Sequence, residues 1–307
     1  MDGILVIDKP TGFSSHDIVQ KTRRIAKQRK VGHAGTLDPL ATGVLPLLLG
    51  KATKISRYLI GQDKSYAAEL CFGITTDTLD SDGRVLEHKE VDFSPEQLEE
   101  VLEAFRGHIE QIPPMYSAKK IAGKKLYELA RKGEVVEREA KKIHIYSLEL
   151  LDFNAPKCRL RVKCSSGTYI RTLADDIGRA LGCGAHLTAL RRLEVGSFSL
   201  SQALTLEEME AQEGALKGAL VSMDDALMGM PTIELSSHLE RMVCSGHQLK
   251  VQDVQNLSIP VFSRDEAILL KSQEGKVLAV ARSVFACDTL LHEPMEERAL
   301  KTERVLV

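Results

Sequence analysis

The stretch of sequence that decides the fold is Gly32-His33-Ala34-Gly35-Thr36-Leu37-Asp38-Pro39-Leu40-Ala41-Thr42-Gly43. Its glycines and its proline impose an unusual backbone path on a long loop, and Asp38 is the carboxylate at its centre. Two interpretations are open. The Asp-Pro pair can cap a helix that begins at Pro39. Alternatively, a carboxylate on a rigid, glycine-lined loop beside His33 is where a nucleophile or general base would be placed.

A second informative stretch runs from Cys164 to Arg171 and reads CSSGTYIR. The strand predicted before it alternates apolar and basic side chains, and Gly167 marks a bulge or a close backbone approach. If residues 169–171 are extended, Tyr169 and Arg171 share one face. An aromatic ring and a guanidinium on one face suit stacking on a base and pairing with a carboxylate or phosphate. A solvent-facing strand edge is the alternative.

Two further segments carry candidate residues. Tyr66 lies in the strand predicted over 64–72, where a core or cross-strand position is the simpler interpretation of an aromatic residue. Residues 182–192 read as a glycine turn and a short apolar segment that ends in Arg191-Arg192. These two arginines either contact phosphates or lie on a solvated face.

Helices and strands are predicted to mix without a regular βαβ alternation, which indicates an α+β protein. Strands are expected at 4–7, 64–72, 143–150 and 159–164. Helices are expected after Ser14, at 95–105 with Ser94 as the cap, at 175–181 and within 205–229. We place a domain boundary at Pro231, which gives domains 1–230 and 231–307. The second is predicted to be small and mostly β, with a helix at 237–244 and strands at 259–262, 267–270 and 277–281.

The charge of the chain is unevenly distributed. The whole sequence has 41 Lys+Arg and 43 Asp+Glu, a formal net charge of −2. Residues 1–204 hold 31 basic and 26 acidic side chains, whereas residues 205–307 hold 10 and 17. The basic excess in the first two thirds is a reason to expect a polyanionic partner there.

Several classes of protein lack their sequence signatures. No apolar run is long enough for a membrane helix, and the N-terminus is not a secretory signal. Six scattered cysteines fit a reducing, cytoplasmic environment and form no metal-ligand motif. The glycine-rich loops of nucleotide-binding folds and the Gly-x-Ser-x-Gly motif of serine hydrolases are missing. The segment 78–89 is similar to an EF-hand calcium loop but lacks the residues required at its first and last positions, so we interpret it as an Asx-rich turn. The residues therefore predict a cofactor-free domain with one poised aspartate.

In ordered blocks over about residues 1–200, the chain resembles the bacterial tRNA pseudouridine synthase B family, which isomerises uridine 55 in the TΨC arm. The blocks are Asp8-Lys9-Pro10-x-Gly12-x-Ser14-Ser15, the stretch 32–43, Lys64-x-Tyr66, residues 73–83, Gly167-Thr168-Tyr169-Ile170-Arg171, and Gly184-Ala185-His186-Leu187 with Leu190-Arg191-Arg192. The resemblance implies a pseudouridine synthase fold, namely a mixed, mostly antiparallel sheet flanked by helices. It also implies that neither cofactor nor metal is needed.

The resemblance also implies roles for individual residues. Asp38 would be the essential aspartate, paired with Arg171, and Tyr66 would stack on the flipped base and take the C5 proton. Attack at the sugar C1′ and proton removal from C2′ both stay open as the role of the carboxylate. The remaining substrate-binding candidates are His33, Tyr169, Leu190 and Lys9.

An RNA partner follows from the same resemblance. The basic segment at about 113–146 matches a thumb-like insertion that closes over the RNA arm. Candidate contacts to the RNA backbone are Lys119, Lys120, Lys124, Lys125 and Arg191. The tail resembles a PUA domain, a small RNA-binding β-barrel. The expected partner is the TΨC stem-loop of tRNA, bound by a cytoplasmic monomer without a guide RNA or a membrane.

Two alternatives of other kinds stay open. The chain could be a catalytically idle RNA-binding or RNA-folding module that kept the scaffold, although Asp38 argues against it. It could also be a synthase that depends on a guide RNA. Activity on a bare stem-loop separates these possibilities.

Overall fold

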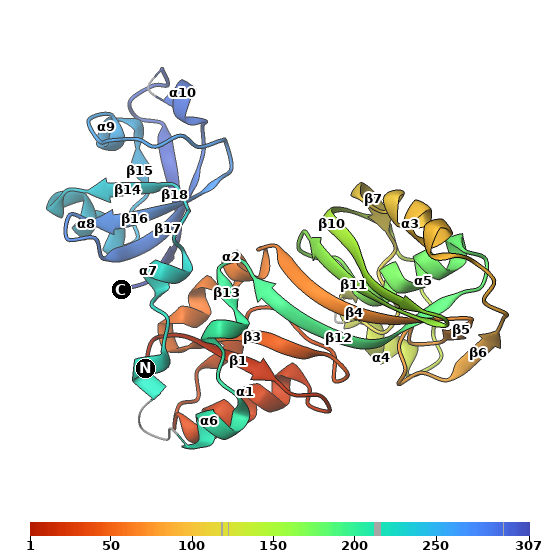
Figure 1. Ribbon diagram of the computed structural model, residues 1–307. Coiled ribbons are helices and arrows are strands. Elements are labelled where there is room, and N and C mark those ends of the chain that lie inside the picture. The colour runs from red at the N-terminus through yellow and green to blue at the C-terminus, as the bar shows by residue number, and fades with distance from the viewer. Residues whose placement is uncertain (118, 122, 212–215, 291) are drawn as a thin grey trace.

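The computed structural model describes residues 1–117, 119–121, 123–211, 216–290 and 292–307, without the side chains of Lys120 and Lys125 (Figure 1). Its larger sheet has nine strands. They are β1 (Gly3–Lys9), β2 (Val31–His33), β3 (Thr42–Leu49), β4 (Lys64–Phe72), β7 (Gly107–Gln111), β10 (Lys141–Asn154), β11 (Lys157–Cys164), β12 (Ala185–Val195) and β13 (Phe198–Ser199). The main path is β1-β3-β12-β4-β11-β10-β7, with β2 beside β3 and β13 beside β12.

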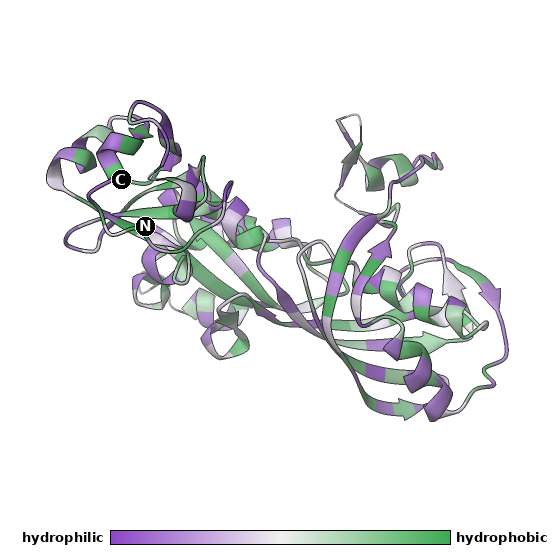
Figure 2. Ribbon diagram, turned by 90° about the horizontal axis from the view of Figure 1, so that it is seen from above, coloured by the Kyte–Doolittle hydropathy of each residue, from purple (hydrophilic) through white to green (hydrophobic). Residues whose placement is uncertain are grey.

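The larger sheet is mixed and mostly antiparallel, as predicted. Its one parallel pair among the described strands joins β3 and β12 through two residue pairs, Thr42 with Arg191 and Gly43 with Arg192. In β11 the side chains alternate between buried and exposed, and Figure 2 shows this striping of hydrophobic and hydrophilic residues along the far strands of the sheet. One face of these strands is therefore covered and the other faces solvent.

The helices that cover the larger sheet begin at well-formed caps. Helix α1 (Ser15–Ile25) starts after Ser14, whose side chain and that of Asp17 form a capping box. Ser94 forms the same motif with Gln97 at α3 (Pro95–Glu103). The apolar faces of α3 and α5 (Ile170–Ala180) pack on the sheet in one buried cluster. Shorter helices are α2 (Ser56–Ile60), α4 (Leu126–Ala130), α6 (Leu206–Ala211) and α7 (Met223–Ala226), and 3-10 turns lie at Gly50–Ile55, Leu200–Gln202 and Leu216–Ala219.

Several predicted elements are wrong. No helix follows Asp38: the segment makes a single turn, in which the Ala41 amide donates to the Asp38 carbonyl at 3.1 Å, and then enters β3. Strand β3 was unexpected because residues 43–49 are buried on both faces, which removes the alternation that identifies a strand. The segment 182–192 is mostly the long strand β12. The helical prediction within 205–229 is confirmed, and the described helical pieces there are short.

The C-terminal residues form a second sheet of five strands, in the order β14-β16-β17-β18-β15. The strands are β14 (Thr232–Leu235), β15 (Leu249–Lys250), β16 (Ala267–Ser272), β17 (Val277–Ser283) and β18 (Arg298–Val305), with helices α8 (Ser237–Cys244), α9 (Val251–Val254) and α10 (Cys287–Leu290). The expected strand at 259–262 is wrong: Phe262 instead lies buried in a loop against the core. Strand β18, which is rich in polar residues, was missed.

The two sheets share part of their core. Leu269 and Val280 of the C-terminal sheet, and Leu306 just after it, pack in one buried cluster with Ile55 and with Leu59 of α2. Around this cluster, Glu303 pairs with Arg57 and accepts a hydrogen bond of 2.8 Å from the Tyr58 hydroxyl. The Lys54 ammonium donates to the Val305 carbonyl at 2.7 Å. These contacts hold the C-terminal sheet against the side of the larger one (Figure 1).

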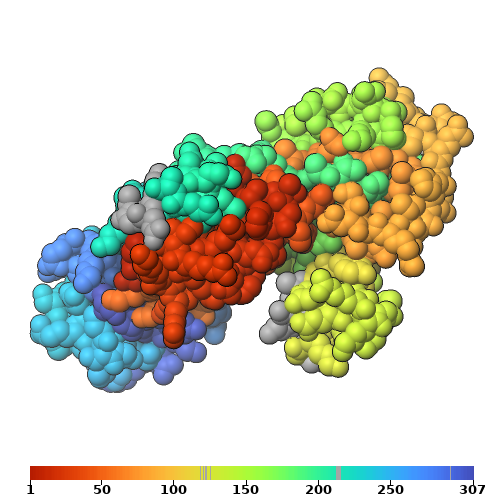
Figure 3. All heavy atoms as spheres, turned by 90° about the horizontal axis from the view of Figure 1, so that it is seen from below, coloured from red at the N-terminus to blue at the C-terminus, as the bar shows by residue number. Residues whose placement is uncertain are grey.

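An insertion stands apart from the larger sheet. It contains the hairpin β8 (Lys120–Ile121) and β9 (Lys124–Lys125), followed by α4. A separate hairpin, β5 (Ile74–Thr76) with β6 (Val85–His88), lies at the end of the sheet. Figure 3 shows an open cleft between the insertion, in yellow-green, and the N-terminal residues, in red. No described helix is both long and apolar enough to cross a membrane.

Gly43 permits the close approach of β3 to β12. Its φ is +101°, and a Cβ added there would overlap the Arg192 carbonyl and lie 2.9 Å from the Arg192 amide nitrogen. Both atoms belong to the backbone of β12, which is fixed in the sheet between β3 and β4 and cannot move away. We therefore expect Gly43→Ala to lower the free energy of unfolding by about 3–5 kcal/mol, through backbone strain and overpacking together.

The control for this prediction is Gly229→Ala. Gly229 has a φ of +97° but no atom within 4 Å of an added Cβ. This variant should lose only the strain of the backbone, about 1–2 kcal/mol. Chemical denaturation followed by circular dichroism measures both, and equal losses would show that the β3–β12 contact is not the cause.

Candidate active site

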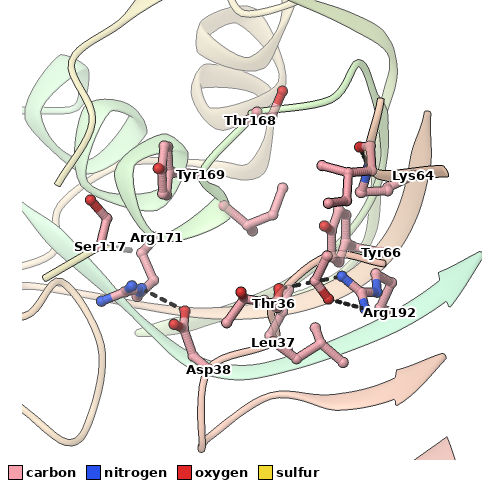
Figure 4. A pocket seen from close by; sticks show the side chains of 15 residues that line it. Thr36, Leu37, Asp38, Lys64, Tyr66, Ser117, Thr168, Tyr169, Arg171 and Arg192 are labelled. Atoms are coloured by element: carbon pink, nitrogen blue, oxygen red, sulfur yellow. Dashed lines mark hydrogen bonds and ion pairs between the residues drawn. The ribbon is translucent and has the colours of Figure 1, made fainter. Parts of the chain in front are cut away.

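The deepest part of the cleft is a cavity of about 270 Å³ at the centre of the larger sheet. Six parts of the chain supply its walls: the loop before β3, the end of α2, the start of β4, the insertion at Ser117, the loop before α5 with the first turn of that helix, and β12 (Figure 4). Its lining includes Asp38, Tyr66, Tyr169, Arg171 and Leu190. The volume is just below the roughly 300–1,000 Å³ of sites for drug-sized ligands, so it suits one small group.

A second, wider cavity of about 780 Å³ adjoins the first. Asp38, Arg171 and Ser117 line both cavities. The wider cavity extends from His33 and the start of α1 to Tyr127 on the insertion. A long ligand could therefore lie across the cleft while one of its groups enters the deep cavity beside Asp38.

The Asp38 carboxylate is held by Arg171. The two side chains form an ion pair with 2.9 Å between Arg171 Nε and Asp38 Oδ2. The Arg171 side chain is only 6% exposed, whereas that of Asp38 is 38% exposed and faces the cavity. The guanidinium therefore fixes one edge of the carboxylate and leaves the other edge available to a ligand.

The remaining donors of Arg171 are also occupied. One terminal nitrogen lies 3.3 Å from Asp80 Oδ2 and donates to the Thr78 carbonyl at 3.0 Å. The other donates to the Tyr116 carbonyl, at the base of the insertion, at 2.7 Å. Because every side of this planar group has a partner, its position is fixed.

Arg171 reaches Asp38 from a helix, so the extended conformation that we considered for residues 169–171 holds only at Tyr169. Ile170 begins α5, and Tyr169 is the residue before it. The Gln111 side chain holds Tyr169 in place: its amide donates to the Tyr169 carbonyl and its oxygen accepts from the Tyr169 amide, at 3.1 and 2.7 Å. Tyr169 and Arg171 still both line the cavity, because the turn into the helix brings them to it.

The surroundings of Asp38 change its acidity. Burial raises the pKa of the Asp38 carboxyl above its ordinary value, and the like charge of Asp80 adds to this effect. The positive charges of Arg171 and Lys9 oppose it. A carboxylate with a raised pKa is a better proton acceptor than an ordinary aspartate, which suits a general base as well as a nucleophile.

Tyr66 lies on β4 at the other side of the deep cavity, and its residue is only 6% exposed. In the pairing of β4 with β12 its register partner is Arg192. Burial raises the pKa of Tyr66 to about 12, although the positive charge of the neighbouring Arg192 acts in the opposite direction. Lys64 lies two residues earlier, where its ammonium donates to the carbonyls of Ile60 and Gln62 at 3.0 and 2.5 Å.

Two of the predicted binding residues do not line the deep cavity. Lys9 is fully buried, and its ammonium donates to the carbonyls of Phe13, Pro10 and Pro39 at 2.7, 2.9 and 3.3 Å. Its predicted contact with substrate is therefore corrected: Lys9 ties the strand β1 to the loop of Asp38. His33 lines the wider cavity instead.

The predicted RNA-contacting cations are placed in different ways. Arg191 forms a two-pronged pair with Asp8, at 2.6 and 3.1 Å, and keeps 42% of its side chain exposed. Lys124 is exposed and Lys119 half-buried on the insertion. The side chains of Lys120 and Lys125 lie outside the described part of the structure.

Residues that the sequence analysis did not select complete the site. Asp80 and Thr78 belong to the segment that we interpreted as a turn, and Ser117 lines both cavities. Arg192, for which we considered a phosphate contact or a solvated face, is instead only 1% exposed and lines the deep cavity. The described residues contain no cluster of His, Cys, Asp and Glu that could hold a metal ion. The alternation of side chains along β12 is the one signal that could have assigned Arg192 to the interior.

Comparisons with known proteins agree over most of the chain. A family model described as "TruB family pseudouridylate synthase (N terminal domain)" matches residues 23–170. Another, described as "tRNA pseudouridylate synthase B C-terminal domain", matches residues 171–228. The chain is 51% identical over 243 residues to tRNA pseudouridine synthase B of Pseudomonas aeruginosa strain UCBPP-PA14, covering 78% of this chain and 80% of the relative.

A more complete match is tRNA pseudouridine synthase B of Cupriavidus metallidurans, which is 42% identical over 309 residues and covers 99% of this chain and 94% of the relative. Among solved structures, a Cbf5-Nop10-Gar1 complex contains a chain with a TM-score of 0.80 and 26% identity. That match covers 99% of this chain and 85% of the other. The similarity therefore includes the C-terminal sheet.

Proposed function

The chain belongs to the TruB family of pseudouridylate synthases, and we propose that it converts uridine 55 in the TΨC arm of tRNA into pseudouridine. The observation that supports this reaction most directly is the pair of Asp38 and Arg171 in a cavity lined by two tyrosines. A carboxylate, an aromatic surface and no metal cluster among the described residues suit an isomerisation in which nothing is oxidised or hydrolysed.

The target base must leave the RNA stack to reach Asp38. Such flipping costs a few kcal/mol. Stacking on an aromatic side chain returns about 1–3 kcal/mol for each base. Tyr66 and Tyr169 line opposite parts of the deep cavity (Figure 4), and Leu190 on β12 lines it as well. We propose that these three residues hold the flipped base and that the wider cavity beside His33 takes the neighbouring nucleotides.

In the proposed reaction the bond from C1′ to N1 breaks and a bond from C1′ to C5 forms. Asp38 acts at the sugar, either by attack at C1′ or by removal of the C2′ proton. After the uracil has turned, the Tyr66 oxygen takes the proton from C5 while the phenol passes its own proton to solvent, and solvent returns one to N1, so atoms and charge balance and Tyr66 ends as it began. Arg171 keeps the carboxylate oriented throughout.

The decisive assay uses a TΨC stem-loop without any guide RNA or partner protein. Formation of pseudouridine at position 55, and none when that uridine is replaced by cytidine, is the expected result. Binding without any product would favour the idle RNA-folding module. Activity that requires an added guide would favour a guide-dependent synthase.

The pH dependence of the reaction should reflect Asp38. Activity requires the carboxylate form, and the raised pKa means that this form is lost at a higher pH than for an ordinary aspartate. Asp80→Asn removes the like charge and leaves Arg171 more available to Asp38, and both changes lower the pKa of Asp38. We therefore expect the acid limb of kcat/KM to move to lower pH in this variant, and a limb that stays in place or moves upward would contradict the assignment.

The insertion is proposed to close over the RNA, as the thumb of about 113–146 in a catalytic domain 1–230. Replacing Lys119, Lys120, Lys124 and Lys125 by glutamine should lower the slope of log affinity against log salt by about 3 to 4, since each phosphate contact contributes about 0.9. The control replaces Arg159, Arg161 and Lys163. These side chains are exposed on the face of β11 opposite to its buried side chains. Equal effects of both sets would indicate a general charge effect.

We further propose that residues 231–307 act as a PUA-like RNA-binding domain and that the enzyme works as a monomer. The fixed position of the C-terminal sheet beside the larger sheet supports the first proposal, because one RNA could contact both bodies without a hinge motion. Light scattering of the active enzyme tests the second.

A further inference from the structure

Helix α1 ends in a concentration of positive charge. Residues 21–30 contain six basic side chains and no acidic one. A cavity of about 450 Å³ lies at this end of the helix, and its lining consists of Gln20, Arg23, Arg24, Lys27, Gln28 and Arg29. We call these six residues the α1 basic surface. A concave surface that offers only cations and amides fits an anionic ligand.

The stability of the helix does not account for all of this charge. Arg24, Lys27 and Arg29 are exposed. A favourable interaction with the helix dipole can explain Arg24 in the last turn, but the effect fades beyond that turn. Lys27 and Arg29 lie beyond the last residue of α1, which is Ile25. Among the residues that the structure describes, neither Arg24 nor Arg29 forms an ion pair.

The backbone at Lys27 is strained. Its φ is +50°, in the left-handed region. The Gln28 amide donates to the Arg23 carbonyl at 3.0 Å. The Lys27 amide donates to the Arg24 carbonyl at 3.2 Å, which completes a Schellman motif. Glycine is the usual residue at this position, because a left-handed backbone is unfavourable for any residue with a Cβ. A lysine here therefore costs stability, which indicates that its side chain serves another purpose.

The other end of α1 borders the candidate active site. Ser14, Ser15 and His16 line the wider cavity. Eleven residues at about 1.5 Å each place the two ends of the helix about 16 Å apart. This distance is the length of about five stacked base pairs. Figure 3 shows the N-terminal residues, in red, as the wall of the cleft opposite the insertion. An RNA whose loop enters the cleft could therefore lay its stem along α1 and reach the basic end.

We propose that the α1 basic surface binds phosphates of the RNA stem, as a second contact region separate from the insertion. This inference rests on the proposed function, and it deepens that function by assigning a part of the enzyme to the stem. The surface lies one helix length from the cavity that holds the target base. It should therefore contribute to RNA affinity and KM but not to kcat.

The first test replaces Arg24, Lys27 and Arg29 together by glutamine. Fluorescence anisotropy measures the binding of two hairpins that share one TΨC loop and have stems of about three and about twelve base pairs. The Kd of the long hairpin should rise at least about 10-fold, and its slope of log affinity against log salt should fall by about 2 to 3. The Kd of the short hairpin should change less than about 2-fold, and kcat at saturating RNA should equal that of the wild type.

The second test is Lys27→Gly, which removes the charge and relieves the backbone at once. If the lysine is kept for RNA, stability and binding should change in opposite directions. We expect Tm to rise by about 1–2 °C and the affinity for the long hairpin to fall about 3-fold. A lower Tm, or an unchanged affinity, would show that Lys27 is not kept for RNA and would contradict the inference.

The control replaces Arg159, Arg161 and Lys163 on β11 by glutamine, which removes the same amount of charge from exposed positions. This variant should bind both hairpins as the wild type does. Three results would overturn the inference: an equal loss in the control, an equal loss for the short hairpin, or an unchanged salt slope in the α1 variant. Binding is measured without turnover. A wild type that binds both hairpins but forms no pseudouridine would therefore refute the proposed function alone.

Discussion

Asp38→Asn should lower the rate of pseudouridine formation at least about 10⁴-fold, the scale of loss seen when a group that reacts directly is removed. Asparagine keeps the shape of the side chain and can still contact Arg171, but it can neither attack C1′ nor accept a proton from C2′. The Asp38 side chain is 38% exposed toward the cavity, so its replacement should leave the fold and the RNA affinity nearly intact. Mass spectrometry of the digested RNA measures the product.

The control for Asp38→Asn is Asp82→Asn, which makes the same chemical change in the wall of the wider cavity. We expect it to retain nearly all activity. If Asp38→Asn still turned over at a substantial fraction of the wild-type rate, Asp38 would not be the reacting group. If Asp82→Asn lost as much activity, the effect would come from the general charge of the cleft.

Arg171→Lys is the second change with a large expected effect. Lysine keeps the charge, but it cannot reach Asp38, Asp80 and the carbonyls of Thr78 and Tyr116 at once. The carboxylate of Asp38 would lose its fixed orientation, and a misplacement of about 1 Å can cost about 10²-fold in rate. We therefore expect kcat to fall by about 10²–10³-fold, with RNA binding mostly retained.

Arg179→Lys on the same helix provides the comparison. Arg179 pairs with Asp175 at 2.8 Å, but its side chain is 73% exposed and lies at the far end of α5. The two substitutions are chemically identical, so a difference between them reports the environment of Arg171. Unchanged turnover of Arg171→Lys would remove Arg171 from the site.

The candidate site could be predicted only in part from the sequence. The motif blocks indicated Asp38, Arg171 and Tyr66 together, and the structure brings these residues to one cavity. The role of Asp80 could not be predicted because the pattern around it indicates only a turn. A turn pattern does not show that the Asp80 carboxylate pairs with the distant Arg171. The conformation of residues 169–171 stayed open because three residues are too few to distinguish the end of a loop from the first turn of a helix.

The same limits explain the errors in the fold. Strand β11 was predictable because its alternation reflects one buried face, whereas β3 is buried on both faces and shows none. The long strand β12 would have been informative, since neighbouring side chains in a strand point to opposite faces. Arg191 turns to Asp8 and remains half exposed, and Arg192 turns inward. Lys9 was selected through the motif block that contains it, but its carbonyl partners are set by backbone geometry that no motif shows.

The packing of the two sheets affects how the molecule can be divided. Leu269, Val280 and Leu306 cover Ile55 and Leu59, so the tail supplies part of the interior of the body that carries Asp38. If the chain were cut at Pro231, the fragment that carries Asp38 would keep Ile55 and Leu59 but lose the residues that cover them. These two side chains would then face water as part of an exposed apolar patch. Such a fragment should associate with itself or with other proteins, although every residue of the cavity is present. The two sheets therefore share no strand pairing, but they do share one hydrophobic cluster. An expression boundary drawn between them would divide that cluster.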